Sequence, residues 1–191
     1  MLATRTQQTR ERILEAAESL FCARGIHSVG VDEVVSRSGV AKMTLYKHFE
    51  SKDTLVAAVM ARKAASFEAW FAAEVAARSA DPVGRLLACF DVYAAWFETP
   101  EFRGCPFINA TAELSDPAHP ARNVAMSHKR AMLELLTEMC KAARVQSPRQ
   151  LAEQWLLLLD GASAEAMLWQ SPVPAARARQ IARALLDHPG T

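Results

Sequence analysis

The sequence has few glycines and few β-branched residues. Its 191 residues include 7 Gly, and Val and Ile together number 17, against 36 Ala. Alanine is the strongest helix former, whereas Val and Ile favour strands, so this balance predicts an all-α fold. The sequence also has little net charge, only +1, since 22 basic residues stand against 21 acidic ones. That balance excludes a polybasic, histone-like protein, and whole-chain charge alone gives no indication of DNA binding.

Long apolar runs and paired cysteines are missing as well. The N-terminal residues lack the apolar run of a signal peptide, and no uncharged stretch is long enough to span a bilayer. The four cysteines are far apart and form no CxxC pair, which favours reduced thiols over a zinc site or a disulfide framework. We therefore expect a cytoplasmic protein with no membrane association, no metal and no cofactor. The hydrophobic content of 51% excludes a disordered chain.

Apolar residues at helical spacing, interrupted by Gly and Pro, divide the chain into about nine helices. Gly25 and Gly39 separate the first three, which form a helix-turn-helix pattern. A long fourth helix of about 27 residues starts at Ser51 and connects two parts of the molecule. The expected helices cover approximately residues 9–24, 31–38, 42–48, 51–78, 82–98, 107–114, 120–144, 148–170 and 174–187.

The segment from residue 39 to residue 55, GVAKMTLYKHFESKDTL, contains the residues best suited to bind DNA. Val40, Leu45 and Phe49 are predicted to face the core. The outward set is then Lys42, Met43, Thr44, Tyr46, Lys47 and His48. Lysine and hydroxyl groups contact phosphates, and Lys, Thr and His also reach base edges, while Lys52 beside a helix N-terminus suits a phosphate. Residues 37–52 hold four basic residues against Glu50 alone, a local net charge of +3.

This segment resembles the DNA-binding signature of the TetR/AcrR family of transcriptional regulators, in the order GV-x-K-x-T-L-Y-x-H-F-x-S-K-x-x-L. The resemblance implies a helix-turn-helix domain over residues 1–54 and an effector-binding and dimerisation domain over residues 55–191. It also implies double-stranded operator DNA, a small-molecule effector and a second copy of the chain as partners. Gly30 departs from the Thr or Ser usual in the family, and Met43 stands where Gly is frequent. The expected function is a ligand-responsive repressor without enzymatic activity.

Large side chains after residue 55 supply candidates for the effector site and the dimer interface. Aromatic and apolar side chains are typical of small-molecule sites. The expected ligand-binding residues are Trp70, Phe90, Tyr93, Trp96, Phe97, Phe107, Asn109, Met126 and Trp155. The resemblance implies that the last two helices pair with those of a second subunit. The expected interface residues are Leu151, Trp155, Leu158, Ala162, Trp169, Ile181 and Leu185.

Alternative interpretations have less support from the residues. Glu113, Asp116 and His119 could be taken for a metal cluster, and Cys105 for a nucleophile, but neither has a recognisable spacing or partner motif. An enzyme using the C-terminal region would need an acid–base, metal or nucleophile motif that is not evident. A transcriptional activator of the same fold, or a small-molecule-binding helical protein with a secondary DNA function, stays open as an alternative.

Overall fold

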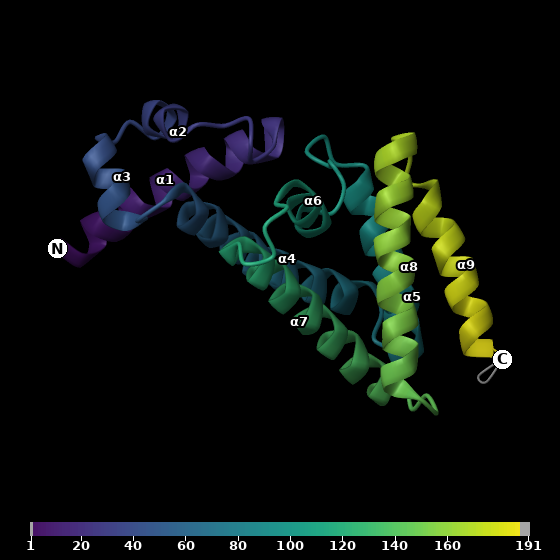
Figure 1. Ribbon diagram of the computed structural model, residues 1–191. Coiled ribbons are helices and arrows are strands. Elements are labelled where there is room, and N and C mark those ends of the chain that lie inside the picture. The colour runs from purple at the N-terminus through teal and green to yellow at the C-terminus, as the bar shows by residue number, and fades with distance from the viewer. Residues whose placement is uncertain (1, 188–191) are drawn as a thin grey trace. The chain divides into compact units, whose positions relative to one another are not determined.

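The computed structural model describes the backbone of residues 2–187 and the side chains of residues 5–187. Over this range the chain forms helices and connecting turns without a strand, which confirms the all-α class (Figure 1). The helices are α1 (Leu2–Arg24), α2 (Val31–Ser38), α3 (Lys42–His48), α4 (Lys52–Arg78), α5 (Pro82–Phe97), α6 (Pro106–Glu113), α7 (Pro120–Ala142), α8 (Pro148–Trp169) and α9 (Val173–Asp187).

Most helix bounds agree with the prediction, and α1 is the exception. The helices α2 and α3 have the expected bounds, and α4 has the expected 27 residues. The first helix begins at Leu2 rather than near Thr9. Its added turns carry Gln, Thr and Arg rather than an apolar stripe, so periodicity gave no signal there. Gln and Arg are good helix formers, and no Gly or Pro interrupts them, which explains why the helix extends.

The chain divides into two compact units. Unit 1 comprises the residues up to Ala65 together with Pro106–Ser127, and unit 2 comprises Ser66–Cys105 and the residues from His128 onward. Both α4 and α7 contribute residues to each unit. The predicted boundary after residue 54 divides a DNA-binding part from an effector-binding and dimerisation part. It does not coincide with the division into compact units, and it stays a prediction.

Unit 1 is built around a small core between α1 and the helix-turn-helix. Ile13, Leu14 and Phe21 of α1 are buried, as are Leu45 of α3 and Leu55 of α4. The helix α1 packs against both α2 and α3. These helices thus share one apolar centre, which holds α3 on the surface with its opposite side exposed.

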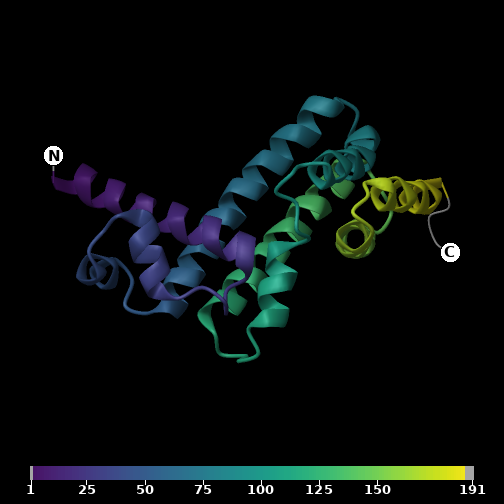
Figure 2. The ribbon, with the colours of Figure 1, turned by 90° about the horizontal axis from the view of Figure 1, so that it is seen from above.

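Unit 2 is organised around α5, α8 and α9, which pack against one another. Figures 1 and 2 both show α8 and α9 as neighbours joined by a short turn. Asp81 caps α5 through its carboxylate, which accepts a hydrogen bond from the Gly84 amide at 2.6 Å. Trp155 of α8 is fully buried, and its indole Nε1 donates to the Leu86 carbonyl at 2.9 Å. None of the described helices has the length and apolarity needed to cross a membrane.

Candidate DNA-binding surface

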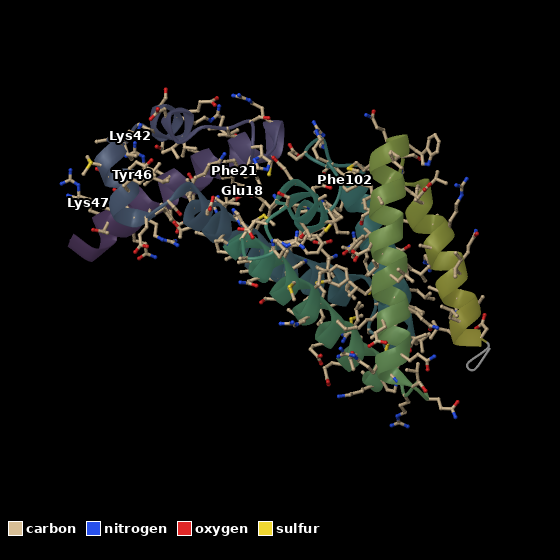
Figure 3. The ribbon with its side chains drawn as sticks, in the orientation of Figure 1. Glu18, Phe21, Lys42, Tyr46, Lys47 and Phe102 are labelled. Atoms are coloured by element: carbon tan, nitrogen blue, oxygen red, sulfur yellow. The ribbon has the colours of Figure 1, made fainter. Side chains whose placement is uncertain are left out.

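The helix α3 is anchored through one side and exposed on the other. Leu45 is completely buried and Phe49 nearly so, which fixes the helix against unit 1. Met43 and Tyr46 are 70% and 39% exposed, and Figure 3 shows Tyr46 along α3 between Lys42 and Lys47. Lys42 and Lys47 are exposed as well, while Thr44 and His48 are half-buried. Six of the predicted DNA-binding residues therefore lie on one short helix, and four of these six are exposed.

The turn between α2 and α3 sets the direction of α3. Gly39 has a φ of +65°, in the left-handed region that favours glycine, and its amide donates to the Val35 carbonyl at 3.0 Å. Arg12 of α1 donates from its guanidinium to the Ser38 carbonyl at 2.6 Å. A Cβ on residue 39 would lie 3.1 Å from that guanidinium. The turn is thus locked both by backbone conformation and by a side chain from α1.

The positive charges near α3 are in different environments. The Lys42 ammonium lies 2.6 Å from Asp32 Oδ1 on α2, and the hydrogen bond to Asp32 raises the pKa of Lys42. Arg37 donates to the Ser19 hydroxyl at 3.1 Å. Lys47 and Lys52 form no ion pair within the described part of the chain. Sequence reasoning missed Asp32, because only the packing of α2 beside α3 brings it to Lys42.

The start of α4 is capped in the way the sequence predicts. The Ser51 hydroxyl accepts a hydrogen bond from the Thr54 amide at 3.1 Å, and the Ser51 amide donates to the Thr54 hydroxyl at 3.0 Å. Lys52 is the first residue of the helix and is half-buried. This places its ammonium-bearing side chain beside the positive end of α4, which is a favourable position for an anion.

An ion-pair network holds the first half of α4 against α1. Arg62 contacts Glu18 at 2.5 Å and Glu11 at 3.2 Å, and Lys63 contacts Glu18 at 3.2 Å. Burial acts to raise the pKa of Glu18, but hydrogen bonds from Arg62 and Lys63 outweigh it and lower the pKa. Glu18 and Phe21 lie along α1 in Figure 3. The network fixes α4 relative to the helix that supports α3.

A segment distant in sequence completes unit 1. The Glu113 carboxylate at the end of α6 accepts a hydrogen bond from the His27 amide at 2.5 Å, and His27 Nε2 lies 2.8 Å from the Glu113 carbonyl oxygen. His119 Nδ1 accepts from the Ala121 amide at 3.1 Å, so its Nε2 carries the proton in the neutral ring and faces Asp53 Oδ1 at 3.3 Å. These polar groups join residues 106–127 to the helix-turn-helix.

The predicted ligand residues fall into three groups, and the first is an aromatic cluster in unit 2. Phe67 is its centre, with ring centroids 5.2 Å from Trp96, 5.5 Å from Trp70 and 6.0 Å from Tyr93. Trp96 also contacts Phe97 and Phe102, the latter labelled in Figure 3. The structure brings together four predicted residues, namely Trp70, Tyr93, Trp96 and Phe97. Phe67 was missed as a ligand candidate because its spacing marked it only as part of the α4 apolar face.

The other two groups lie elsewhere. Phe90 and Trp155 are buried with ring centroids 5.8 Å apart, so they pack in the core of unit 2, and their assignment to a ligand site stays a prediction. Phe107, Asn109 and Met126 belong to unit 1, where Phe107 is buried and Met126 is half-exposed. The nine-residue ligand site as a whole stays a prediction.

Polar groups border the aromatic cluster within unit 2. His128 Nδ1 lies 2.7 Å from Glu68 Oε1, and its ring is 5.8 Å from that of Phe67. Burial lowers the pKa of His128, although the hydrogen bond to Glu68 opposes this shift. Lys129 and Asp160 form a second ion pair. Burial raises the pKa of the Tyr93 hydroxyl well above its ordinary value.

A separate cavity lies at the end of unit 2 where α7 meets α8. It has a volume of about 720 Å³ and is lined by apolar side chains, by Arg144 and Arg183, and by three glutamines. Of the predicted residues, only Leu151 and Leu185 border it. Both had been assigned to the dimer interface, so this cavity was not anticipated from the sequence.

The residues predicted for the interface on α8 differ in exposure, and their role in a dimer stays a prediction. Trp155, Leu159, Ala162 and Ala166 are buried in the core of their own chain, while Leu151 and Leu158 are half-buried. The exposed residues of α8 include the apolar or small Leu157, Gly161, Ala164 and Leu168. Apolar and small residues occur on both sides of this helix, so periodicity alone does not decide which side meets a second subunit. Trp169 and Ile181 are 69% and 53% exposed and stay available to a second subunit.

Comparison with known proteins agrees with this architecture. Residues 13–59 match the bacterial regulatory proteins of the tetR family, and residues 82–182 match the tetracycline repressor-like C-terminal domain. A TetR-family transcriptional regulator from Streptomyces coelicolor is 30% identical, with 95% of each chain covered and a TM-score of 0.81. Its likeness extends over both units.

Two curated relatives match over shorter lengths. The transcriptional activator FasR of Mycolicibacterium smegmatis is 46% identical over 55 residues, which are 29% of this chain and 25% of FasR. An HTH-type regulator of Mycobacterium tuberculosis is 33% identical over 110 residues, 51% of this chain and 52% of that protein. The chain thus spans between a quarter and a half of these relatives. The resemblance read from residues 39–55 is confirmed: the chain is a DNA-binding transcription regulator, not an enzyme, and it belongs to the TetR family.

Proposed function

We propose that the protein is a ligand-responsive repressor that binds a pseudo-palindromic operator as a homodimer. The observation that carries this proposal is the exposed side of α3, where Lys42, Tyr46 and Lys47 project from a helix anchored by Leu45. A helix of this kind enters the major groove and contacts base edges, while flanking cations contact phosphates. The proposed DNA-binding residues are the predicted ones: Lys42, Met43, Thr44, Tyr46, Lys47, His48 and Lys52.

The exposed face of α8 and α9 supports the proposed dimer. Leu157 and Leu168 are 73% and 68% exposed on α8, and Ile181 is exposed on α9. Apolar side chains gathered on two neighbouring helices are typical of a protein–protein contact. In the proposed dimer, the two copies of α3 occupy successive major grooves, about 34 Å apart.

The aromatic cluster around Phe67 supports a small apolar or amphipathic effector. Trp70 and Trp96 at its edge retain exposed surface, and the Glu68–His128 pair supplies polar groups beside the rings. Ligand sites combine apolar walls with a few polar groups of this type. Because α4 and α7 contribute residues to both units, an effector that prefers one arrangement of these helices would shift DNA affinity.

A gel-shift titration with the region upstream of the protein's own gene tests the proposal. We expect a discrete complex with this DNA, and none with a scrambled duplex at the same protein concentration. Tyr46→Ala is the variant that should lose the complex, and Ile108→Ala, an exposed apolar position on α6, is the matched control that should keep it. Equal binding to both duplexes would reject sequence-specific regulation and favour a small-molecule-binding protein with a secondary DNA function.

An activator of the same fold is the second candidate, favoured by the similarity of the DNA-binding region to FasR, which is named an activator. Transcription in vitro from the bound promoter separates the two. A repressor lowers transcript yield, and addition of effector restores it; an activator raises the yield. We expect the protein to lower transcript yield, as a repressor does. We also expect it to act in the cytoplasm.

A further inference from the structure

An acidic side chain stands within the basic surface around α3, in addition to Glu50, which follows the helix. Asp32 occupies the first turn of α2, and its side chain is 77% exposed. Its Oδ1 atom lies 2.6 Å from the ammonium of Lys42, the first residue of α3. Figure 3 shows Lys42 on the DNA-facing helix, at the end of α3 nearest α2. An exposed carboxylate here would repel phosphates, so its presence on a DNA-binding surface needs a reason.

Folding does not supply that reason. An ion pair between two exposed side chains contributes little to stability. The neighbouring Glu33 already serves the start of α2, because its carboxylate accepts a hydrogen bond from the Gly30 amide at 3.1 Å and pairs with Arg24. Asp32 adds a favourable charge at the positive end of α2, but that effect is small and would be the same without Lys42.

The pair changes what Lys42 can do on DNA. An unpaired lysine is a flexible cation that binds any phosphate, whereas Lys42 is held by Asp32 and partly neutralised. One of its three N–H donors points to Asp32, which leaves two for DNA, and the carboxylate keeps free acceptor capacity. The result is a donor and an acceptor side by side at the start of the recognition helix.

This arrangement complements a G·C base pair. In the major groove, guanine presents the acceptors O6 and N7, and its cytosine partner presents the N4 donor beside them. Lysine recognises guanine through these acceptors, and aspartate accepts from cytosine N4. We propose that Asp32 and Lys42 act as one unit that recognises a G·C pair in each operator half-site. In this unit, Asp32 is a specificity-determining residue that lowers binding to phosphates while it directs Lys42 to the base.

The inference rests on the proposed DNA binding through α3, and its test uses the full-length protein. Binding is measured by fluorescence anisotropy over a range of salt concentrations, on operator duplex, on random duplex, and on operators in which each G·C pair of the half-site is replaced in turn by A·T. For Asp32→Asn, we expect tighter binding to random duplex and a salt slope steeper by about 1 per subunit, because Lys42 becomes free to bind a phosphate. Discrimination at one G·C position should fall by roughly 5- to 150-fold.

Three further variants isolate the pair. In a Lys42→Ala background, Asp32→Asn should no longer steepen the salt slope, because no lysine is released. Asp32→Glu keeps the carboxylate and should retain most of the discrimination. Glu50→Gln is the matched control: it removes another exposed acid close to α3, and it should leave discrimination at every G·C position unchanged.

The outcomes distinguish the inference from the function on which it rests. If the wild-type protein does not prefer operator over random duplex, the proposed function fails. If it does prefer operator, but Asp32→Asn leaves the salt slope and the G·C discrimination as they were, the recognition unit is refuted. Uniform loss of binding by Asp32→Asn, together with a lowered melting temperature, would also refute it, by showing that Asp32 acts through folding.

Discussion

Replacing Leu157 by Arg should convert the proposed dimer into folded monomers. Leu157 is 73% exposed within its own chain, so the longer charged side chain meets no core and the fold of the subunit is unaffected. In a twofold dimer the same residue occurs twice at the interface. Full burial of one leucine contributes about 1.5–3 kcal/mol, so two copies contribute about 3–6 kcal/mol.

That loss corresponds to a dissociation constant raised by about 10²- to 10⁴-fold, before the added cost of burying two guanidinium groups. Sedimentation equilibrium measures the dissociation constant directly, and circular dichroism checks that helix content is retained. Ile108→Arg is the control, because it introduces the same group at an exposed apolar position on α6. A folded Leu157→Arg protein that stays dimeric at low micromolar concentration would refute the assignment of this face.

Further changes test other parts of the structure. Tyr46→Ala should abolish operator binding in an anisotropy assay without lowering the melting temperature, since the ring is partly exposed; retained affinity would reject the reading face. Lys47→Ala should reduce the salt slope by about 0.9 per subunit, and an unchanged slope would exclude a phosphate contact. Trp155→Phe should lower the free energy of unfolding in urea by about 2–4 kcal/mol, because a buried carbonyl loses its donor and a void is left; a change below 1 kcal/mol would contradict this packing. Burial lowers the pKa of His128 below its ordinary 6.5 despite the hydrogen bond that the ring donates to Glu68. Stability should therefore fall as pH drops below 6.5 and the unfolded chain takes up the proton, and His128→Gln should flatten that dependence in thermal melts.

Local chemistry explains why so many helix bounds could be predicted. Gly25 and Gly39 end α1 and α2 in left-handed conformations, with φ of +82° and +65°. Pro82, Pro120 and Pro148 each stand at the first position of a helix, where the missing amide hydrogen is no loss. These signals depend on one or two neighbouring residues. They are therefore visible without knowledge of the tertiary structure.

Which side of a helix faces the core depends on tertiary packing rather than on one or two neighbouring residues. On α8, Trp155 and Leu159 point into the subunit while Leu157 and Leu168 are exposed, yet all four are large and apolar. A helix that must contact its own chain on one side and a second chain on the other has apolar residues on both sides. The hydrophobic pattern of such a helix does not distinguish the side that faces its own chain from the side that faces a second chain. On α8, the packing against α5 and α9 identifies the side that faces its own chain.

Which cations around α3 are available to bind DNA also depends on tertiary contacts. Residues 37–52 have a net charge of +3, but Asp32 lies outside that window and pairs with one of its four cations. Arg37 is directed towards Ser19 of α1. Lys47 and Lys52 are then the cations of the window best placed to bind phosphates. A surface with few free cations binds random DNA weakly, so discrimination among sequences must come from directed contacts such as those proposed for Asp32 and Lys42.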